Sequence, residues 1–221
     1  MTANQLDAAH KPVKALSITV FLVITEAKMK DKIYVGDYRK GEIEIVESHR
    51  IFENKYATVF NDDVIFPGGY KGTYLRFCQQ NGESVAVLPI TKDGRILLIK
   101  NFRHGARGWG LEIPKGGIED GESASEAARR ELFEETGYTS TRLEELGEYC
   151  DSPAVLCGSL KCFVAFDCQK CSEPSPEKTE SIEKVVEAAP HDLTAMQDGL
   201  DFSDALTELL IYKYIFRYGG K

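Results

Sequence analysis

The sequence predicts an α+β fold, in which a mixed sheet carries few helices and follows an N-terminal β-strand extension. Strand-type runs outnumber helical segments and do not alternate regularly with them, which argues against a doubly wound sheet. One Ala-rich segment carries capping signals at both ends, and an amphipathic segment closes the chain. The 221 residues, 43% of them hydrophobic, are enough to bury one sizeable core.

The first eighty residues are expected to form a tail and then strands. Residues 1–14 are polar at the start and lack periodicity, which predicts a flexible tail. Residues 15–25 form an uncharged run shorter than the roughly 20 residues that span a bilayer. Its β-branched residues favour a strand, and the core of a signal peptide is the alternative. Turn residues such as Pro67-Gly68-Gly69 separate the strands expected at 17–24, 42–46, 56–64 and 73–77.

The rest of the chain is expected to form the main domain, so we divide the sequence into a tail (1–14), a β extension (15–80) and a domain (81–221). A hairpin is predicted at Lys92-Asp93-Gly94 between strands at 85–90 and 95–102. A glycine-rich loop with Gly105, Gly108 and Gly110 leads to a short strand through Leu111 and Ile113. Later strands are expected at 143–149, 160–166 and 182–188, a loop at 171–179, and a helix at 204–218 capped by Ser203.

The most informative segment is a helix predicted at residues 124–136. Ser123 and Glu126 have capping-box spacing, and Gly137 suits the left-handed residue after a helix end. At about 100° per residue, Glu131 and Glu135 share a stripe with small alanines. Like charges on one partly buried face repel, so a cation should compensate them. With Glu134 and Arg130 nearby, the pattern indicates a Mg²⁺ or Mn²⁺ site, and a solvated acidic face is the alternative.

Net charge and cysteine content limit the partners and the compartment. The chain has 27 Lys and Arg and 35 Asp and Glu, a net charge of −8, which disfavours nucleic acid and anionic membranes as partners. A small polyanion can still bind through a divalent cation. The six cysteines are too few for a disulfide scaffold, so we expect free thiols and a cytoplasmic location. Cys168 and Cys171 form a C-x-x-C without a second pair, which disfavours structural zinc.

The segment around the helix resembles the Nudix box of Nudix hydrolases. All seven fixed Gly, Glu and Arg positions are present, and Tyr138 replaces the usual aliphatic residue at the end; the seven are Gly116, Glu122, Arg130, Glu131, Glu134, Glu135 and Gly137. The resemblance implies an α/β/α sandwich around a mixed sheet. It also implies that the enzyme cleaves a nucleoside diphosphate linked to another moiety, with Mg²⁺ or Mn²⁺ as cofactor.

The same resemblance assigns roles within the box. Glu131 and Glu135 would be the principal metal ligands, with Glu134 as an additional ligand and the Lys115 carbonyl as a backbone ligand. Arg130 would orient the glutamates, and Glu122 would anchor the loop that enters the helix. Gly116, Glu122, Arg130 and Gly137 are therefore expected to be structural.

Two further segments resemble the ADP-ribose pyrophosphatase group of that family. They are Leu111-Glu112-Ile113-Pro114-Lys115-Gly116 with the preceding Asn101-Phe102-Arg103, and Ser152-Pro153, although Ala154 replaces the usual glycine after the proline. By this resemblance, Arg103 would contact a substrate phosphate, and Glu112 would bind near the terminal ribose or support the metal cluster. Pro153 is expected near the substrate, and Trp109 could stack on the base or serve as a core or lid residue.

The loop before the last predicted strand is expected to supply the general base. Residues 179–182 resemble the group's mobile base-bearing loop, so Glu180 is the first candidate, Glu183 the second and Glu134 the next. The function implied is hydrolysis of ADP-ribose to AMP and ribose 5-phosphate. The alternatives are GDP-mannose or another nucleotide sugar as substrate, or a non-catalytic nucleotide-binding module. N-terminal strands commonly form a swapped dimer in this group, so a homodimer is expected.

Overall fold

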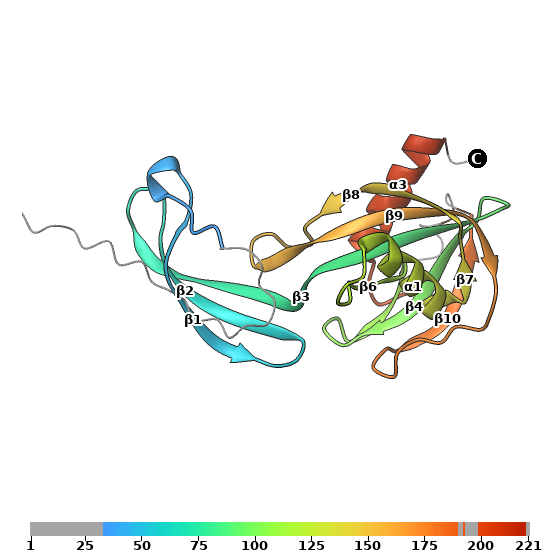
Figure 1. Cartoon of the computed structure of the whole chain (residues 1–221), viewed down its shortest axis with the longest axis horizontal. Coiled ribbons are helices and arrows are strands. Elements are labelled where there is room, and N and C mark those ends of the chain that lie inside the picture. Colours follow the sequence, from blue (N-terminus) through green and yellow to red (C-terminus); the bar gives the residue numbers. More distant parts are fainter. Residues whose placement is uncertain (1–32, 190–191, 193–198, 220–221) are drawn as a thin grey trace, which may run out of the picture. The chain divides into compact units, whose positions relative to one another are not determined.

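Figure 1 shows the chain as a computed structural model, which describes residues 33–189, 192 and 199–219. The chain divides into two units, Met1–Val35 and Gly36–Lys221, and the elements below belong to the second unit. The expected tail and the strand expected at 17–24 lie outside the described residues. Among the residues described, no helix has the length and apolarity needed to cross a membrane.

The second unit begins with a three-stranded antiparallel meander. A short 3-10 helix, η1 (Tyr38–Lys40), precedes β1 (Glu44–Glu53), β2 (Ala57–Ile65) and β3 (Lys71–Thr91). β2 pairs with β1 on one side and with the first half of β3 on the other. The strand predicted at 42–46 is therefore longer, because pairing with β2 keeps the polar residues after Val46 extended.

The second half of β3 enters a mixed sheet. It runs parallel to β9 (Leu156–Lys170) and antiparallel to β6 (Lys115–Gly117), and β9 is antiparallel to β8 (Arg142–Tyr149) and β7 (Tyr138–Thr139). On the other side, β4 (Ile96–Arg103) pairs with β3 through the predicted hairpin and also with β5 (Gly108–Glu112) and β10 (Ile182–Ala188). The predicted α+β class with a mixed sheet is confirmed.

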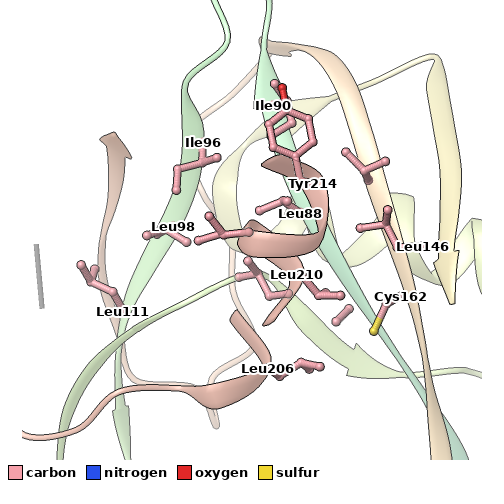
Figure 2. Packing of buried hydrophobic residues seen from close by; sticks show 14 of the residues in the cluster. Leu88, Ile90, Ile96, Leu98, Leu111, Leu146, Cys162, Leu206, Leu210 and Tyr214 are labelled. Carbon is pink, nitrogen blue, oxygen red and sulfur yellow. The ribbon is translucent and has the colours of Figure 1, made fainter. Parts of the chain in front are cut away.

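Helices cover both faces of this sheet. Val85 and Val87 of β3 pack with α1 (Ala124–Thr136), whereas the alternate residues Ala86 and Leu88 belong to the cluster that packs with α3 (Ala205–Tyr218). Successive side chains of a strand point to opposite faces, so one central strand supplies both cores. Figure 2 shows the second core, with Leu206, Leu210 and Tyr214 of α3 gathered with strand residues.

Three further expectations about element boundaries were wrong. The strands expected at 73–77 and 85–90 are one strand, because the polar residues between them pair first with β2 and then with β9. Ser203 does not cap the last helix: Asp204 does, since its carboxylate accepts hydrogen bonds from the Thr207 N–H and hydroxyl. Most of the expected glycine-rich loop is turn, but Gly108 and Gly110 belong to β5, where a Cβ would collide with Asp201 and Phe202.

The expectation of free thiols was wrong for one pair. Cys78 and Cys157 form a disulfide, while Cys150, Cys162, Cys168 and Cys171 are free. The parallel register of β3 and β9 sets the pair directly opposite each other, with their Cα atoms 4.7 Å apart. The two cysteines are 79 positions apart along the chain, which conceals this pairing in the sequence.

Candidate functional site

Helix α1 presents two glutamates on its buried face. Ser123 caps its N-terminus in a capping box with Glu126, and Gly137 ends it in the left-handed region at φ 77°, as the sequence predicts. The face toward the sheet carries small and apolar residues together with Glu131 and Glu135, which are 6% and 1% exposed. The periodicity of the helix thus places both carboxylates at the edge of the core.

A third carboxylate joins this pair from a distant loop. Ligand oxygens of Glu131, Glu135 and Glu180 all lie within 4.8 Å of one another. Glu180 belongs to the irregular segment that precedes β10 and is half-buried. We define these three side chains as the carboxylate cluster.

Burial makes the negative charge of the cluster costly. It raises the pKa of Glu131 to about 7, although the hydrogen bond from Arg130 opposes the shift. Burial, followed by the charges of Glu180 and Glu131, raises the pKa of Glu135 to about 9. Several converging oxygen ligands with excess negative charge suit a hard divalent cation such as Mg²⁺ or Mn²⁺. The residues present therefore fit the metal that the sequence predicts.

Arg130 holds Glu131, one member of the cluster, together with two neighbouring glutamates. Its guanidinium donates to Glu131 at 2.6 Å, to Glu134 at 3.2 Å, and to both carboxylate oxygens of Glu122 at 3.0 Å. It also donates to the Gly117 carbonyl at 2.8 Å, which ties the incoming loop to the helix. The structure places Glu134 beside Arg130 and does not bring it into the carboxylate cluster.

The two box glycines permit close approaches that a side chain would block. A Cβ at Gly116 would collide with the Glu131 carboxylate, and one at Gly137 would collide with the Ser172 carbonyl. Next to Gly116, the Lys115 N–H donates to Glu135 at 3.1 Å. Lys115, the strand residue before the box glycine, therefore contacts the cluster directly through its main chain.

The loop that carries Glu180 is fastened to the end of α1. The N–H groups of Cys171 and Ser172 donate to the Gly137 carbonyl, and Ser175 N–H donates to the Glu134 carbonyl. Glu180 also accepts from the Glu177 N–H at 2.9 Å, which closes a turn. Glu183 lies elsewhere: its carboxylate is 2.6 Å from Lys100, whose hydrogen bond lowers the pKa of Glu183.

A cleft of about 660 Å³ adjoins the cluster. Arg103 lines it and donates to both oxygens of the buried Glu112 at 2.5–3.0 Å. Lys115 lines it too, with its ammonium 3.0 Å from Asp204 and 3.4 Å from Glu112. Two cations held by two carboxylates therefore face the cleft. The sequence indicated Arg103, Glu112 and Lys115 but missed Asp204, whose only visible signal was its place near a helix start.

Trp109 and Pro153 lie apart from this lining. Trp109 packs edge-on against Phe102, with ring centroids 5.4 Å apart, and Lys100 lies over its ring. Pro153 is in an exposed turn before β9. Neither is among the described residues that line the cleft.

The fold and the cluster define a class of protein. The chain belongs to the Nudix family, since the family model for the NUDIX domain matches residues 80–209, and it is a hydrolase that acts on pyrophosphate bonds. It is 31% identical over 163 residues to "ADP compounds hydrolase NudE" of Escherichia coli (strain K12), which covers 74% of this chain and 83% of that protein.

Other relatives agree with this class. "ADP-ribose pyrophosphatase" of Bacillus subtilis (strain 168) is 29% identical over 170 residues, covering 77% of this chain and 91% of that protein. A crystal structure of an ADP compounds hydrolase superposes with a TM-score of 0.68 at 26% identity, covering 81% of this chain and 97% of the other. The predicted family is confirmed.

Proposed function

We propose that this hydrolase cleaves the diphosphate of a nucleoside diphosphate sugar, with ADP-ribose converted by water to AMP and ribose 5-phosphate. The observation that carries the proposal is the convergence of Glu131, Glu135 and Glu180 beside a cleft lined by Arg103 and Lys115. The names of the relatives support an ADP-linked substrate.

Glu131, Glu135 and the Lys115 carbonyl would hold Mg²⁺ or Mn²⁺, with Glu134 as an additional ligand close to Arg130. When bound, the ion supplies positive charge that stabilises the diphosphate in the transition state and makes water a better nucleophile at neutral pH. Arg130 keeps the Glu131 carboxylate oriented through its bond at 2.6 Å and is itself held by Glu122. The hydrogen bond from the Lys115 N–H orients Glu135.

Substrate phosphates are expected to meet Arg103. Its guanidinium is anchored on Glu112, which is 1% exposed, while its own side chain is 41% exposed toward solvent. A buried carboxylate on one side leaves the other side of the guanidinium fork free to bind a phosphate oxygen. The proposal does not rely on Trp109 or Pro153, since both lie outside the lining of the cleft.

Glu180 is the proposed general base. Its carboxylate adjoins both α1 ligands, so a water held at the cluster lies within its reach. Glu183 is a weaker candidate because its ion pair with Lys100 lowers its pKa and directs it elsewhere. Glu134 remains the next candidate, although Arg130 occupies one of its oxygens.

A substrate panel tests the function. Purified protein with Mg²⁺ or Mn²⁺ would be given ADP-ribose, other ADP-sugars, GDP-mannose and UDP-glucose, and products would be separated by anion-exchange chromatography. We expect AMP and ribose 5-phosphate to form fastest. The control is Glu173→Gln, which removes a charge from an 84% exposed side chain of the same loop and should retain activity. Nucleotide binding without product from any substrate would contradict the proposal and favour a non-catalytic module.

We also propose that the chain forms a homodimer through its N-terminal meander. Large apolar side chains on these strands are 37–59% exposed, namely Val46, Ile51 and Phe52 of β1 and Leu75 and Phe77 of β3. Exposed apolar groups gathered on one small sheet are typical of surfaces that another chain covers. Sedimentation equilibrium should give twice the chain mass, and substitution of Phe52 and Leu75 by serine should produce monomers.

A further inference from the structure

The first turn of α3 contacts the segment that leads into the Nudix box. Asp204 caps the helix, and one of its carboxylate oxygens accepts from the Thr207 N–H at 3.1 Å and from the Thr207 hydroxyl at 2.6 Å. Thr207 is fully buried. These residues lie far beyond the box in the sequence, and the motif does not include them.

Two hydrogen bonds connect this turn to residues 113–115. The Thr207 hydroxyl accepts from the Ile113 N–H at 3.0 Å, just after β5 ends at Glu112. The other carboxylate oxygen of Asp204 accepts from the Lys115 ammonium at 3.0 Å. Asp204 and Lys115 are only 17% and 20% exposed. A continuous chain of hydrogen bonds therefore runs from the Ile113 main chain through Thr207 and Asp204 to the Lys115 side chain.

The segment that these bonds hold also reaches the carboxylate cluster. The Lys115 N–H donates to Glu135, and Glu112 at the start of the segment anchors Arg103. A shift of the segment would thus move both the main chain beside the metal ligands and the arginine that faces the cleft. Pro114 has no N–H, so Thr207 and Glu135 hold the two adjoining N–H groups on either side of it.

We propose that Asp204 and Thr207 are positioning residues for the Nudix reaction, which hold residues 112–115 in the place where metal and substrate bind. The proposal rests on the metal-dependent activity proposed above. Groups that orient metal ligands from outside typically change metal affinity or activity by roughly 10- to 100-fold when they are removed. A role limited to anchoring α3 would instead lower stability and leave the folded enzyme unchanged.

Thr207→Val and Thr207→Ser form a matched pair. Valine keeps the shape of threonine but leaves the buried Ile113 N–H without an acceptor, whereas serine keeps the hydroxyl. We expect T207V to raise the dissociation constant for Mn²⁺ and to lower kcat, each by roughly 10-fold or more. Electron paramagnetic resonance measures the binding of Mn²⁺. T207S should have a dissociation constant for Mn²⁺ and a kcat close to those of the wild type.

Asp204→Asn provides a second variant if T207V does not fold. Asparagine is as good an N-cap as aspartate, so the helix start is kept, while the Lys115 ammonium loses one of its two carboxylate partners and keeps Glu112. Glu208→Gln removes one charge from the same turn of α3 and is the control for the helix dipole. We expect D204N to weaken Mn²⁺ binding and E208Q to leave it unchanged.

The outcomes separate the two proposals. If T207V and D204N melt at lower temperature but bind Mn²⁺ and turn over as the controls do, the positioning role is overturned. If the wild type binds Mn²⁺ yet hydrolyses no nucleotide sugar, the proposed function fails, and the Mn²⁺ comparison alone then decides the positioning role.

Discussion

Glu135 is an acidic side chain that is buried almost completely beside two other carboxylates, Glu131 and Glu180. It is 1% exposed, and burial together with two neighbouring carboxylates raises its pKa to about 9. In the absence of a cation, burial of this acidic group lowers the stability of the folded chain. Residues that lower stability yet occupy a converging cluster are characteristic of functional sites.

Glu135→Gln should nearly abolish turnover while leaving the fold intact. The amide removes a negative ligand from the cluster and also relieves the repulsion with Glu131 and Glu180. The melting temperature without metal should therefore stay level or rise, as calorimetry in EDTA would measure. Near-normal Mg²⁺-dependent activity in E135Q would refute the metal assignment.

Glu180→Gln should lower kcat by roughly 10²- to 10⁴-fold, the usual contribution of a positioned acid or base, with a much smaller change in KM. Mn²⁺ binding should persist, because Glu131 and Glu135 come from α1. The test compares kcat and KM under saturating Mg²⁺ for three variants, Glu177→Gln, Glu180→Gln and Glu183→Gln. Small and equal losses in all three would place the base elsewhere, with Glu134 next.

At the scale of elements, the end of α1 and the loop after β9 depend on each other. Gly137 ends the helix, and its carbonyl accepts the N–H groups of Cys171 and Ser172. The same loop continues to Glu180. The glycine is needed both for its positive φ and for the space that the loop fills, so a residue in the helix motif also controls the position of a distant carboxylate.

Gly137→Ala should lower both stability and activity. Alanine at φ 77° costs about 1–2 kcal/mol, and its Cβ would also push against the Ser172 carbonyl. Gly121→Ala is the matched control, because Gly121 has φ 81° but open space around it. Chemical denaturation should show a lower free energy of unfolding in both variants. Steady-state kinetics should show a lower kcat only in G137A. Equal kcat values would mean that Gly137 does not position the loop.

At the scale of the whole molecule, the buried cluster couples global stability to pH. The folded chain holds protons on Glu135 and Glu131 up to pKa values of about 9 and 7, whereas the unfolded chain releases them near the ordinary value of 4.5. The unfolded state therefore binds fewer protons between these limits. The free energy of unfolding of the protein therefore falls as the pH rises. The fall is at most about 1.4 kcal/mol per pH unit for each proton that the folded state retains.

Without metal, the melting temperature should fall between pH 5 and pH 8, and E135Q should show a shallower fall. Saturating Mg²⁺ should reduce the slope in the wild type, since the cation favours the charged carboxylates. Differential scanning fluorimetry in EDTA and in Mg²⁺ measures both slopes. Identical slopes for the wild type and E135Q in EDTA would contradict the burial argument.

Local patterns were enough to predict much of this protein. The limits of α1, its capping box and its glutamate stripe follow from residues within one segment, because helix periodicity and capping act over a few positions. β10 also matches its expected range, 182–188, where the β-branched residues Ile182, Val185 and Val186 favour a strand. The family followed from the spacing of the box residues, which lie within 22 positions of one another.

Contacts between distant segments were decided only by the tertiary structure. The Cys78–Cys157 disulfide, the continuous β3 and the link from Asp204 and Thr207 to residues 113–115 each depend on strand register or helix docking. The sequence by itself determined the helix, the box and the chemistry of its carboxylates, because these depend on near neighbours. Only the packing of the sheet determined which distant groups complete the site, because long-range register leaves no periodic pattern in the chain.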